Sequence, residues 1–212
     1  MRNPKFITLE GIDKTGKTLI WDILKTDFPK YAFITDPPKG DPWGSIFTNG
    51  TIYNGKLPPI SESFIHLSAR LHSYTKKIKI SLEKDISVIS DRYADSWLAY
   101  QAVWNSIYFS DDTASLDFFK KIHDTCIEYG TLINPDITIL ITADIGIIEK
   151  RLEVAENTTK YEDIKNLKKV QDNYLKLAKE YHKRYHIIED KDQGIILVYK
   201  EVKKILKKEG IF

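Results

Sequence analysis

Short apolar runs alternate with longer amphipathic segments along this chain. Five runs rich in β-branched and aromatic residues predict buried strands, at 6–10, 31–35, 86–90, 137–142 and 185–188. Between them, apolar residues at helical spacing predict helices at 16–28, 60–84, 94–108, 114–130, 145–156, 162–183 and 192–208. The stretch 36–59 is rich in proline and glycine, and we interpret it as a loop.

This alternation predicts the fold class. Parallel strands need long crossover connections, which are usually helices, so the order of elements indicates an α/β fold with a parallel sheet and helices on both faces. Such folds bind ligands at the carboxyl ends of their strands. We therefore look for functional residues just after each predicted strand.

Composition narrows the class of protein. A chain of 212 residues with 42% hydrophobic residues fits one domain, residues 1–212. The formal net charge of +2 provides no overall field for binding nucleic acid or a membrane surface. The chain lacks a run of about 18 uncharged apolar residues, which argues against a membrane-spanning helix. The lone Cys126 and the absence of a signal-like start lead us to expect a cytoplasmic protein.

A phosphate-binding motif follows the first predicted strand. It reads Gly11-Ile12-Asp13-Lys14-Thr15-Gly16-Lys17-Thr18 and matches the P-loop pattern GxxxxGK[ST] between a strand and a helix. The glycines let backbone N–H groups surround a polyphosphate, and the helix adds its positive dipole end. We expect Lys17 to reach the β- and γ-phosphates and Thr18 to bind Mg²⁺. A glycine-rich turn with an incidental lysine is the structural alternative.

The third predicted strand ends in Asp91-Arg92-Tyr93, which should face the P-loop across the carboxyl edge of the sheet. Asp91 is expected to order the Mg²⁺ shell, and Arg92 to bind an acceptor phosphate and offset charge on the transferred group. Alternatively, Asp91 caps a helix and Arg92 lies on the surface. A P-loop alone leaves GTPases, motor ATPases and small-molecule kinases open, although the chain has no NKxD guanine-reading motif.

Taken together, several segments resemble the thymidylate kinase family over most of the chain: FITLEGIDKTGKT, HLSARLH, DRYADSWLAYQ, Pro135-Asp136 and KYEDIKNLKKVQDNYLKLA. The run DRYxxSxxAYQ after such a P-loop is more specific than the P-loop alone. The resemblance implies a nucleoside monophosphate kinase fold with a five-stranded parallel core and a small lid. It also implies ATP and Mg²⁺ as co-substrates, dTMP as acceptor and commonly a homodimer.

The resemblance also implies roles on the acceptor side. Asp13 matches the carboxylate that contacts the sugar 3′-hydroxyl, and Arg92 matches the arginine on the acceptor phosphate. Arg70 matches the arginine that reaches the base carbonyl, and two further positions match base-contacting polar residues, namely Ser96 and Gln101.

Tyr100 matches the aromatic residue that crowds the place of a ribose 2′-hydroxyl, which would favour deoxynucleotides. Without the resemblance, Tyr100 is interpreted as a core aromatic.

This chain differs from one branch of the family in the residue that can place positive charge at the transferred phosphoryl group. Bacterial members place arginines in a mobile lid, which corresponds here to about 153–163 and contains no arginine. We therefore expect Lys14 of the P-loop to supply the cation, with Lys160 as the second candidate. Lys160 is alternatively a solvated surface lysine.

Two further departures concern the acceptor pocket. The family's stacking position, usually Phe, falls on His66, which either stacks on the base or is an ordinary surface histidine. The Arg-Glu-Pro-Gly-Gly pattern of relatives is replaced by Asp36-Pro37-Pro38-Lys39-Gly40, and a later phosphate-binding arginine falls on Thr48. Lys39 is a candidate replacement. These changes lead us to expect a relaxed pocket that accepts dUMP as well as dTMP.

Three rival functions remain open from the sequence. The nearest is a nucleotide kinase with a different or broader acceptor. The second is a nucleotide-dependent switch or structural ATPase with the same fold. The third is a catalytically silent binding module, and the intact Lys17, Thr18, Asp91 and Arg92 argue against this third function.

Overall fold

We describe the protein from a computed structural model, which covers residues 3–40, 42–48, 52, 57–154 and 163–212. A parallel sheet of five strands lies at its centre, in the order β2-β3-β1-β4-β5. The strands are β1 (Phe6–Glu10), β2 (Ala32–Thr35), β3 (Val88–Asp91), β4 (Ile137–Ala143) and β5 (Tyr185–Asp190). The sequence prediction of a five-stranded parallel core is confirmed, with strand ends displaced by no more than two residues.

The predicted helices are also confirmed, with shorter bounds and some subdivision. They are α1 (Lys17–Asp27), α3 (Pro59–Ser73), α4 (Lys79–Glu83), α5 (Ala94–Asn105), α6 (Asp112–Glu128), α7 (Ile145–Glu153), α8 (Ile164–Glu180) and α9 (Ile195–Lys208). A π-helical turn, Tyr74–Ile78, joins α3 to α4, so the segment predicted at 60–84 is helical throughout but not uniform. Within the described ranges, no helix is long and apolar enough to span a membrane.

The interpretation of 36–59 as a loop is wrong in one part, because residues Trp43–Thr48 form helix α2. Phe47 and Ile52 are buried against Ala69 of α3 in a small apolar cluster, with Trp43 and Ile46 packed beside them. Burial of these apolar side chains outweighs the local bias of proline and glycine toward turns. The spacing of Trp43, Ile46 and Phe47 carried the helical signal.

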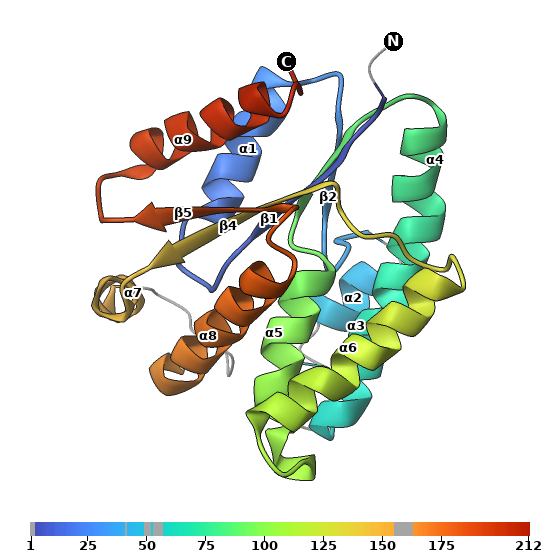
Figure 1. Cartoon of the computed structure of the whole chain (residues 1–212), viewed down its shortest axis with the longest axis vertical. Helices are drawn as coiled ribbons and strands as arrows, with labels where there is room; N and C mark the ends of the chain where they lie inside the picture. Colours follow the sequence, from blue (N-terminus) through green and yellow to red (C-terminus); the bar gives the residue numbers. More distant parts are fainter. Residues whose placement is uncertain (1–2, 41, 49–51, 53–56, 155–162) are drawn as a thin grey trace.

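Helices cover both faces of the sheet (Figure 1). Helices α1 and α9 lie on one face, where they enclose a core that includes Ile7 and Leu9 of β1. Helices α3, α5, α6 and α8 lie on the other face, over a larger core that includes Phe6. Because both faces are buried, the strands read as almost continuous apolar runs.

The pairing of β1 with β3 positions the functional residues. The two strands are parallel and adjacent, with Leu9 opposite Asp91. The loop after β1 and the residues after β3 therefore leave the same edge of the sheet side by side. This edge is where open α/β sheets bind ligands.

Gly11 is required where the chain leaves β1 and passes over β4. Its φ is +141°, and a Cβ at this position would lie 2.2 Å from the carbonyl oxygen of Ile141. We predict that Gly11→Ala lowers the free energy of unfolding by about 3 kcal/mol, because it adds both backbone strain and a contact with backbone.

Gly40→Ala is the control, since no atom lies within 4 Å of a Cβ built there. Urea unfolding of the two variants checks the prediction. Equal stabilities would contradict it.

Candidate active site

The P-loop curls around the carbonyl group of Ile12. The hydroxyl of Thr15 donates to this oxygen at 2.9 Å, and Nζ of Lys17 donates to it at 3.0 Å. Gly16 precedes α1 with a φ of +81° and has no side chain to cap the helix. The first turn of α1 thus lacks a side-chain cap among the described residues, which is the arrangement that suits a phosphate at a helix N-terminus.

Lys17 is a buried cation, with 4% of its surface exposed. Burial lowers the pKa of its ammonium group to about 8, and the positive charge of Arg92 acts in the same direction. The carboxylate of Asp13, 4.0 Å away, partly opposes this shift. A polyphosphate bound in the loop would add negative charge beside Lys17 and stabilise its charged ammonium form.

Thr18 and Asp91 meet where β3 ends beside α1. The hydroxyl of Thr18 donates to Oδ2 of Asp91 at 2.7 Å, while the buried Oδ1 of Asp91 has no hydrogen-bond partner among the described residues. No three His, Cys, Asp or Glu side chains in the described part of the chain gather to hold a metal ion by themselves. A hydroxyl and a free carboxylate oxygen fit Mg²⁺, which keeps waters and phosphate oxygens as its other ligands.

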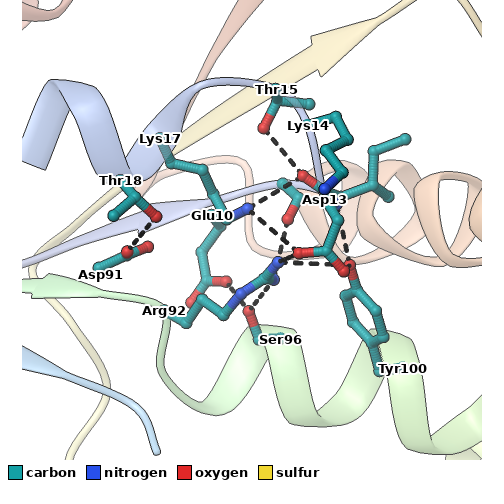
Figure 2. Close-up of polar contacts among 12 residues, drawn as sticks. Glu10, Asp13, Lys14, Thr15, Lys17, Thr18, Asp91, Arg92, Ser96 and Tyr100 are labelled. Atoms are coloured by element: carbon teal, nitrogen blue, oxygen red, sulfur yellow. Dashed lines mark hydrogen bonds and ion pairs between the residues drawn. The ribbon is translucent and has the colours of Figure 1, made fainter. Parts of the chain in front are cut away.

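Arg92 lies at the centre of the polar cluster (Figure 2). Its Nη1 donates to the carbonyl oxygen of Gly11 at 2.9 Å and to the hydroxyl of Ser96 at 3.0 Å. Its Nη2 forms an ion pair with Oδ1 of Asp13 at 2.5 Å and contacts the hydroxyl of Tyr100 at 3.3 Å. The surface alternative for Arg92 is therefore wrong: the side chain points into the site.

Asp13 and Tyr100 form the rim of this cluster. The Tyr100 hydroxyl donates to Oδ2 of Asp13 at 2.9 Å and accepts the N–H of Asp13 at 3.1 Å. Burial by itself would raise the pKa of the Asp13 carboxyl, but the charges of Arg92 and Lys17 outweigh it and lower that pKa. Tyr100 thus combines a buried ring with a hydroxyl that orients the P-loop carboxylate.

Arg70 of α3 is buried where α3 packs against α5. Its Nε and Nη2 both contact Oδ2 of Asp36 at 2.5 Å, and its guanidinium lies 5.5 Å from the ring centres of Tyr93 and Trp97. Burial raises the pKa of Asp36, against the opposing charge of Arg70. Neither Nη1 of Arg70 nor Oδ1 of Asp36 has a hydrogen-bond partner in the described ranges, although both atoms are buried.

The remaining acceptor-side candidates occupy different environments. Gln101 is buried, and its Oε1 accepts from Ser63 at 2.6 Å. Ser96 is engaged within the Arg92 cluster, where its hydroxyl donates to Glu10. His66 is half-buried on α3 with its ring centre 4.7 Å from that of Phe47, and Lys39 is exposed in the loop after β2.

Lys14 has a left-handed backbone, with φ of 66°, and a half-buried side chain. Arg151 of α7 donates to its carbonyl oxygen at 3.0 Å and also pairs with Asp190 and Asp192 at 2.8 and 2.7 Å. Of the predicted lid at 153–163, only residues 153, 154 and 163 are described. Lys160 lies outside the described residues.

Sequence reasoning missed three residues that the structure brings to this site: Glu10, Arg151 and Tyr174. Glu10 could have been found from the sequence, because it is an acidic residue at the end of a buried apolar strand. Arg151 and Tyr174 have ordinary places in amphipathic helices, and nothing in their spacing distinguishes them.

Comparison with known proteins identifies the family. The family profile described as thymidylate kinase matches residues 9–202. The chain is 30% identical over 212 residues to "Thymidylate kinase" of Sulfurihydrogenibium sp. (strain YO3AOP1), covering 97% of this chain and 98% of that protein. It is 29% identical over 208 residues to "Probable thymidylate kinase" of Methanosarcina mazei, covering 96% of each.

A solved structure gives the same result. The crystal structure of thymidylate kinase from Ehrlichia chaffeensis superposes with a TM-score of 0.73 at 26% sequence identity, covering 97% of this chain and 100% of that chain. The family profile, both relatives and this structure agree, and the P-loop, Asp91 and Arg92 lie together as the motifs predict. This chain belongs to the thymidylate kinase family.

Proposed function

We propose that this protein transfers the γ-phosphoryl group of ATP to dTMP and releases dTDP and ADP. One observation carries the proposal: Arg92 donates to the P-loop carbonyl of Gly11 with Nη1 and pairs with Asp13 with Nη2. Since we assign the phosphate of the acceptor to Arg92 and its sugar to Asp13, this side chain would hold the acceptor phosphate against the donor loop. Direct transfer requires the two phosphates to meet in this way. Family membership supports both substrates.

On the donor side, we assign residues 11–18 to the triphosphate. Lys17 places its ammonium group against the β- and γ-phosphates, and Thr18 and Asp91 hold Mg²⁺. When bound, Mg²⁺ neutralises charge on the phosphate oxygens. Arg92 and Lys17 provide fixed positive charge on the side of the site away from solvent.

On the acceptor side, we assign Arg92 to the phosphate and Asp13 to the sugar 3′-hydroxyl. Because Nη2 of Arg92 is paired with Asp13 at 2.5 Å, binding of dTMP exchanges this carboxylate for phosphate oxygens. Tyr100 fixes Asp13 and leaves no room for a 2′-hydroxyl. Arg70 and Gln101 face the base, and Ser96 orients Arg92 in addition to its predicted role near the base. Lys39 approaches the acceptor from the loop after β2.

We propose that Lys14 supplies the positive charge at the transferred group, with Lys160 as a second contact to ATP. Arg151 supports this role, since it holds the Lys14 carbonyl and so fixes the direction of the P-loop at that residue. Closure of the lid at 153–163 excludes water and favours transfer over hydrolysis.

We also propose that the protein is one domain, works in the cytoplasm and forms a homodimer. The one sheet found in the described residues supports a single domain, the lone Cys126 supports a reducing compartment, and the family's typical behaviour supports a homodimer. Light scattering at micromolar concentration distinguishes a dimer from a monomer.

The base pocket is expected to be relaxed, because His66 takes the stacking position. Incubation with ATP, Mg²⁺ and each of dTMP, dUMP, dCMP, dGMP and UMP should yield dTDP and dUDP. An apolar pocket that recognises the methyl group of thymine would favour dTMP by roughly 10- to 200-fold. In a relaxed pocket, the kcat/KM values for dTMP and dUMP should instead lie within about tenfold of each other. His66→Phe should raise the preference for dTMP.

His182→Phe, on the exposed turn after α8, is the matched control and should leave the preference unchanged. A strong preference for dTMP in the unaltered protein would refute the relaxed pocket. Absence of every diphosphate would refute the kinase assignment.

Lys14→Ala should lower kcat about 100-fold with KM for dTMP changed less than threefold, because the lost charge acts on the transition state. Lys14→Arg should restore most of the rate. Alanine and arginine tolerate the left-handed backbone at position 14 no better than lysine does, so backbone strain is the same in both variants and in the unaltered protein. The exposed Lys30→Ala serves as control. An unchanged kcat in Lys14→Ala would show that another residue supplies the positive charge at the transferred phosphoryl group.

The lowered pKa of Lys17 predicts a pH dependence. Below pH 8 the ammonium group is charged and binds the polyphosphate; above it the free enzyme loses the charge, so kcat/KM for ATP should fall by about tenfold per pH unit. Bound ATP raises this pKa again. Calorimetry at pH 8.5 in buffers of different ionisation enthalpy should therefore detect proton uptake on ATP binding. A flat profile up to pH 10 would contradict the assignment.

A further inference from the structure

Glu10 is a fully buried acid that has no role in the function proposed above. It ends strand β1 and lies between the sheet, α5 and α8, with none of its surface exposed. Its Oε1 accepts the N–H of Tyr93 at 2.8 Å, and its Oε2 accepts the hydroxyls of Ser96 at 2.5 Å and Tyr174 at 3.1 Å. All three partners adjoin Arg92: Tyr93 follows it in the chain, and the Ser96 and Tyr174 hydroxyls accept from its Nη1.

The backbone contact fixes an unusual conformation. Arg92 is left-handed, with φ of 69°, which is unfavourable for a side chain other than glycine by about 1 kcal/mol or more. Its own N–H donates to the carbonyl oxygen of Leu9 at 3.0 Å, and the hydroxyl of Ser90 donates to its carbonyl oxygen at 2.5 Å. Glu10 holds the next N–H, that of Tyr93, and so completes the set of hydrogen bonds that over-determine this turn.

The side-chain contacts fix one edge of the guanidinium. Nη1 of Arg92 donates to the carbonyl oxygen of Gly11 at 2.9 Å, to the Ser96 hydroxyl at 3.0 Å and to the Tyr174 hydroxyl at 3.4 Å. The two hydroxyls lie 2.7 Å apart and both also contact Glu10. Figure 2 shows Glu10 and Ser96 on the side of Arg92 away from Asp13.

The opposite edge is the one that exchanges partners. Nη2 points to Asp13 and Tyr100 on the rim, where the acceptor phosphate is proposed to bind. One edge of the guanidinium is thus held by buried groups, and the other faces the site.

Resting on the proposed kinase function, we propose that Glu10 is a positioning residue for the acceptor phosphate. Through the Tyr93 N–H and the Ser96 and Tyr174 hydroxyls, it holds the backbone and the Nη1 edge of Arg92 in place. The Nη2 edge is then free to exchange Asp13 for the phosphate of dTMP without reorientation of the side chain.

Glu10 holds Arg92 in place through its hydrogen bonds and not through a negative charge. Burial raises the pKa of Glu10 to about 8, with the neighbouring charge of Asp95 acting in the same direction, so the carboxyl is largely neutral near pH 7. Glutamine has the same length and keeps an oxygen for the Tyr93 N–H. Aspartate keeps the acid but is one methylene too short to reach both Tyr93 and Ser96.

The test compares Glu10→Asp with Glu10→Gln in the intact enzyme. We expect Glu10→Asp to raise KM for dTMP at least tenfold and to change KM for ATP less than threefold. Glu10→Gln should stay within threefold of the unaltered protein for both. Ser96→Ala should resemble Glu10→Asp, whereas Ser115→Ala, a buried serine on α6 outside the network, should leave both KM values unchanged.

Two results would overturn the positioning role. One is a Glu10→Asp variant with a lower melting temperature but an unaltered KM for dTMP, because a purely structural acid affects the amount of folded enzyme and not its affinity. The other is a Glu10→Gln variant as impaired as Glu10→Asp. Failure of the unaltered protein to form dTDP would instead refute the kinase function, so the two failures are distinguishable.

Discussion

The parallel pairing of β1 with β3 brings the P-loop next to Asp91 and Arg92, and the rest of the site is arranged around this contact. Leu9 is opposite Asp91, so the P-loop and the turn at Arg92 leave the sheet together. A shift of one residue along either strand would move Asp91 and Glu10 to the wrong faces, because side chains alternate along a strand. The register is fixed by the apolar cores on both faces, which hold Phe6 on one side and Ile7 and Leu9 on the other.

Charge is balanced within the site before any substrate binds. Two largely buried cations, Lys17 and Arg92, lie beside the carboxylates of Asp13 and Asp91, while the buried acid of Glu10 is largely neutral near pH 7. Burial disfavours the charged forms of Lys17 and Glu10, whereas the carboxylate of Asp13 is favoured by its cationic neighbours. The two cations would bind phosphate groups locally, so a chain of nearly neutral net charge needs no overall positive field to hold highly charged substrates.

Much of this structure could be predicted from the sequence, for identifiable reasons. The P-loop motif and the DRY run depend on local spacing, and the five strands depend on short apolar runs that both faces of a sheet bury. Helix α2 was missed because its stability comes from contacts of Phe47 and Ile52 with Ala69, which are distant in sequence. The pairing of Arg70 with Asp36, and the convergence of Ser96 and Tyr174 on Glu10, likewise depend on tertiary packing that no local pattern encodes.

In the proposed mechanism, Arg92 is shared between the P-loop and the acceptor phosphate. A crystal structure with dTMP, Mg²⁺ and a non-hydrolysable ATP analogue tests it most directly. We predict that Nη2 of Arg92 leaves Asp13 and contacts the phosphate of dTMP, while Nη1 stays on the carbonyl of Gly11 and the hydroxyl of Ser96. An Arg92 that remains paired with Asp13, with the dTMP phosphate held by other residues, would contradict it.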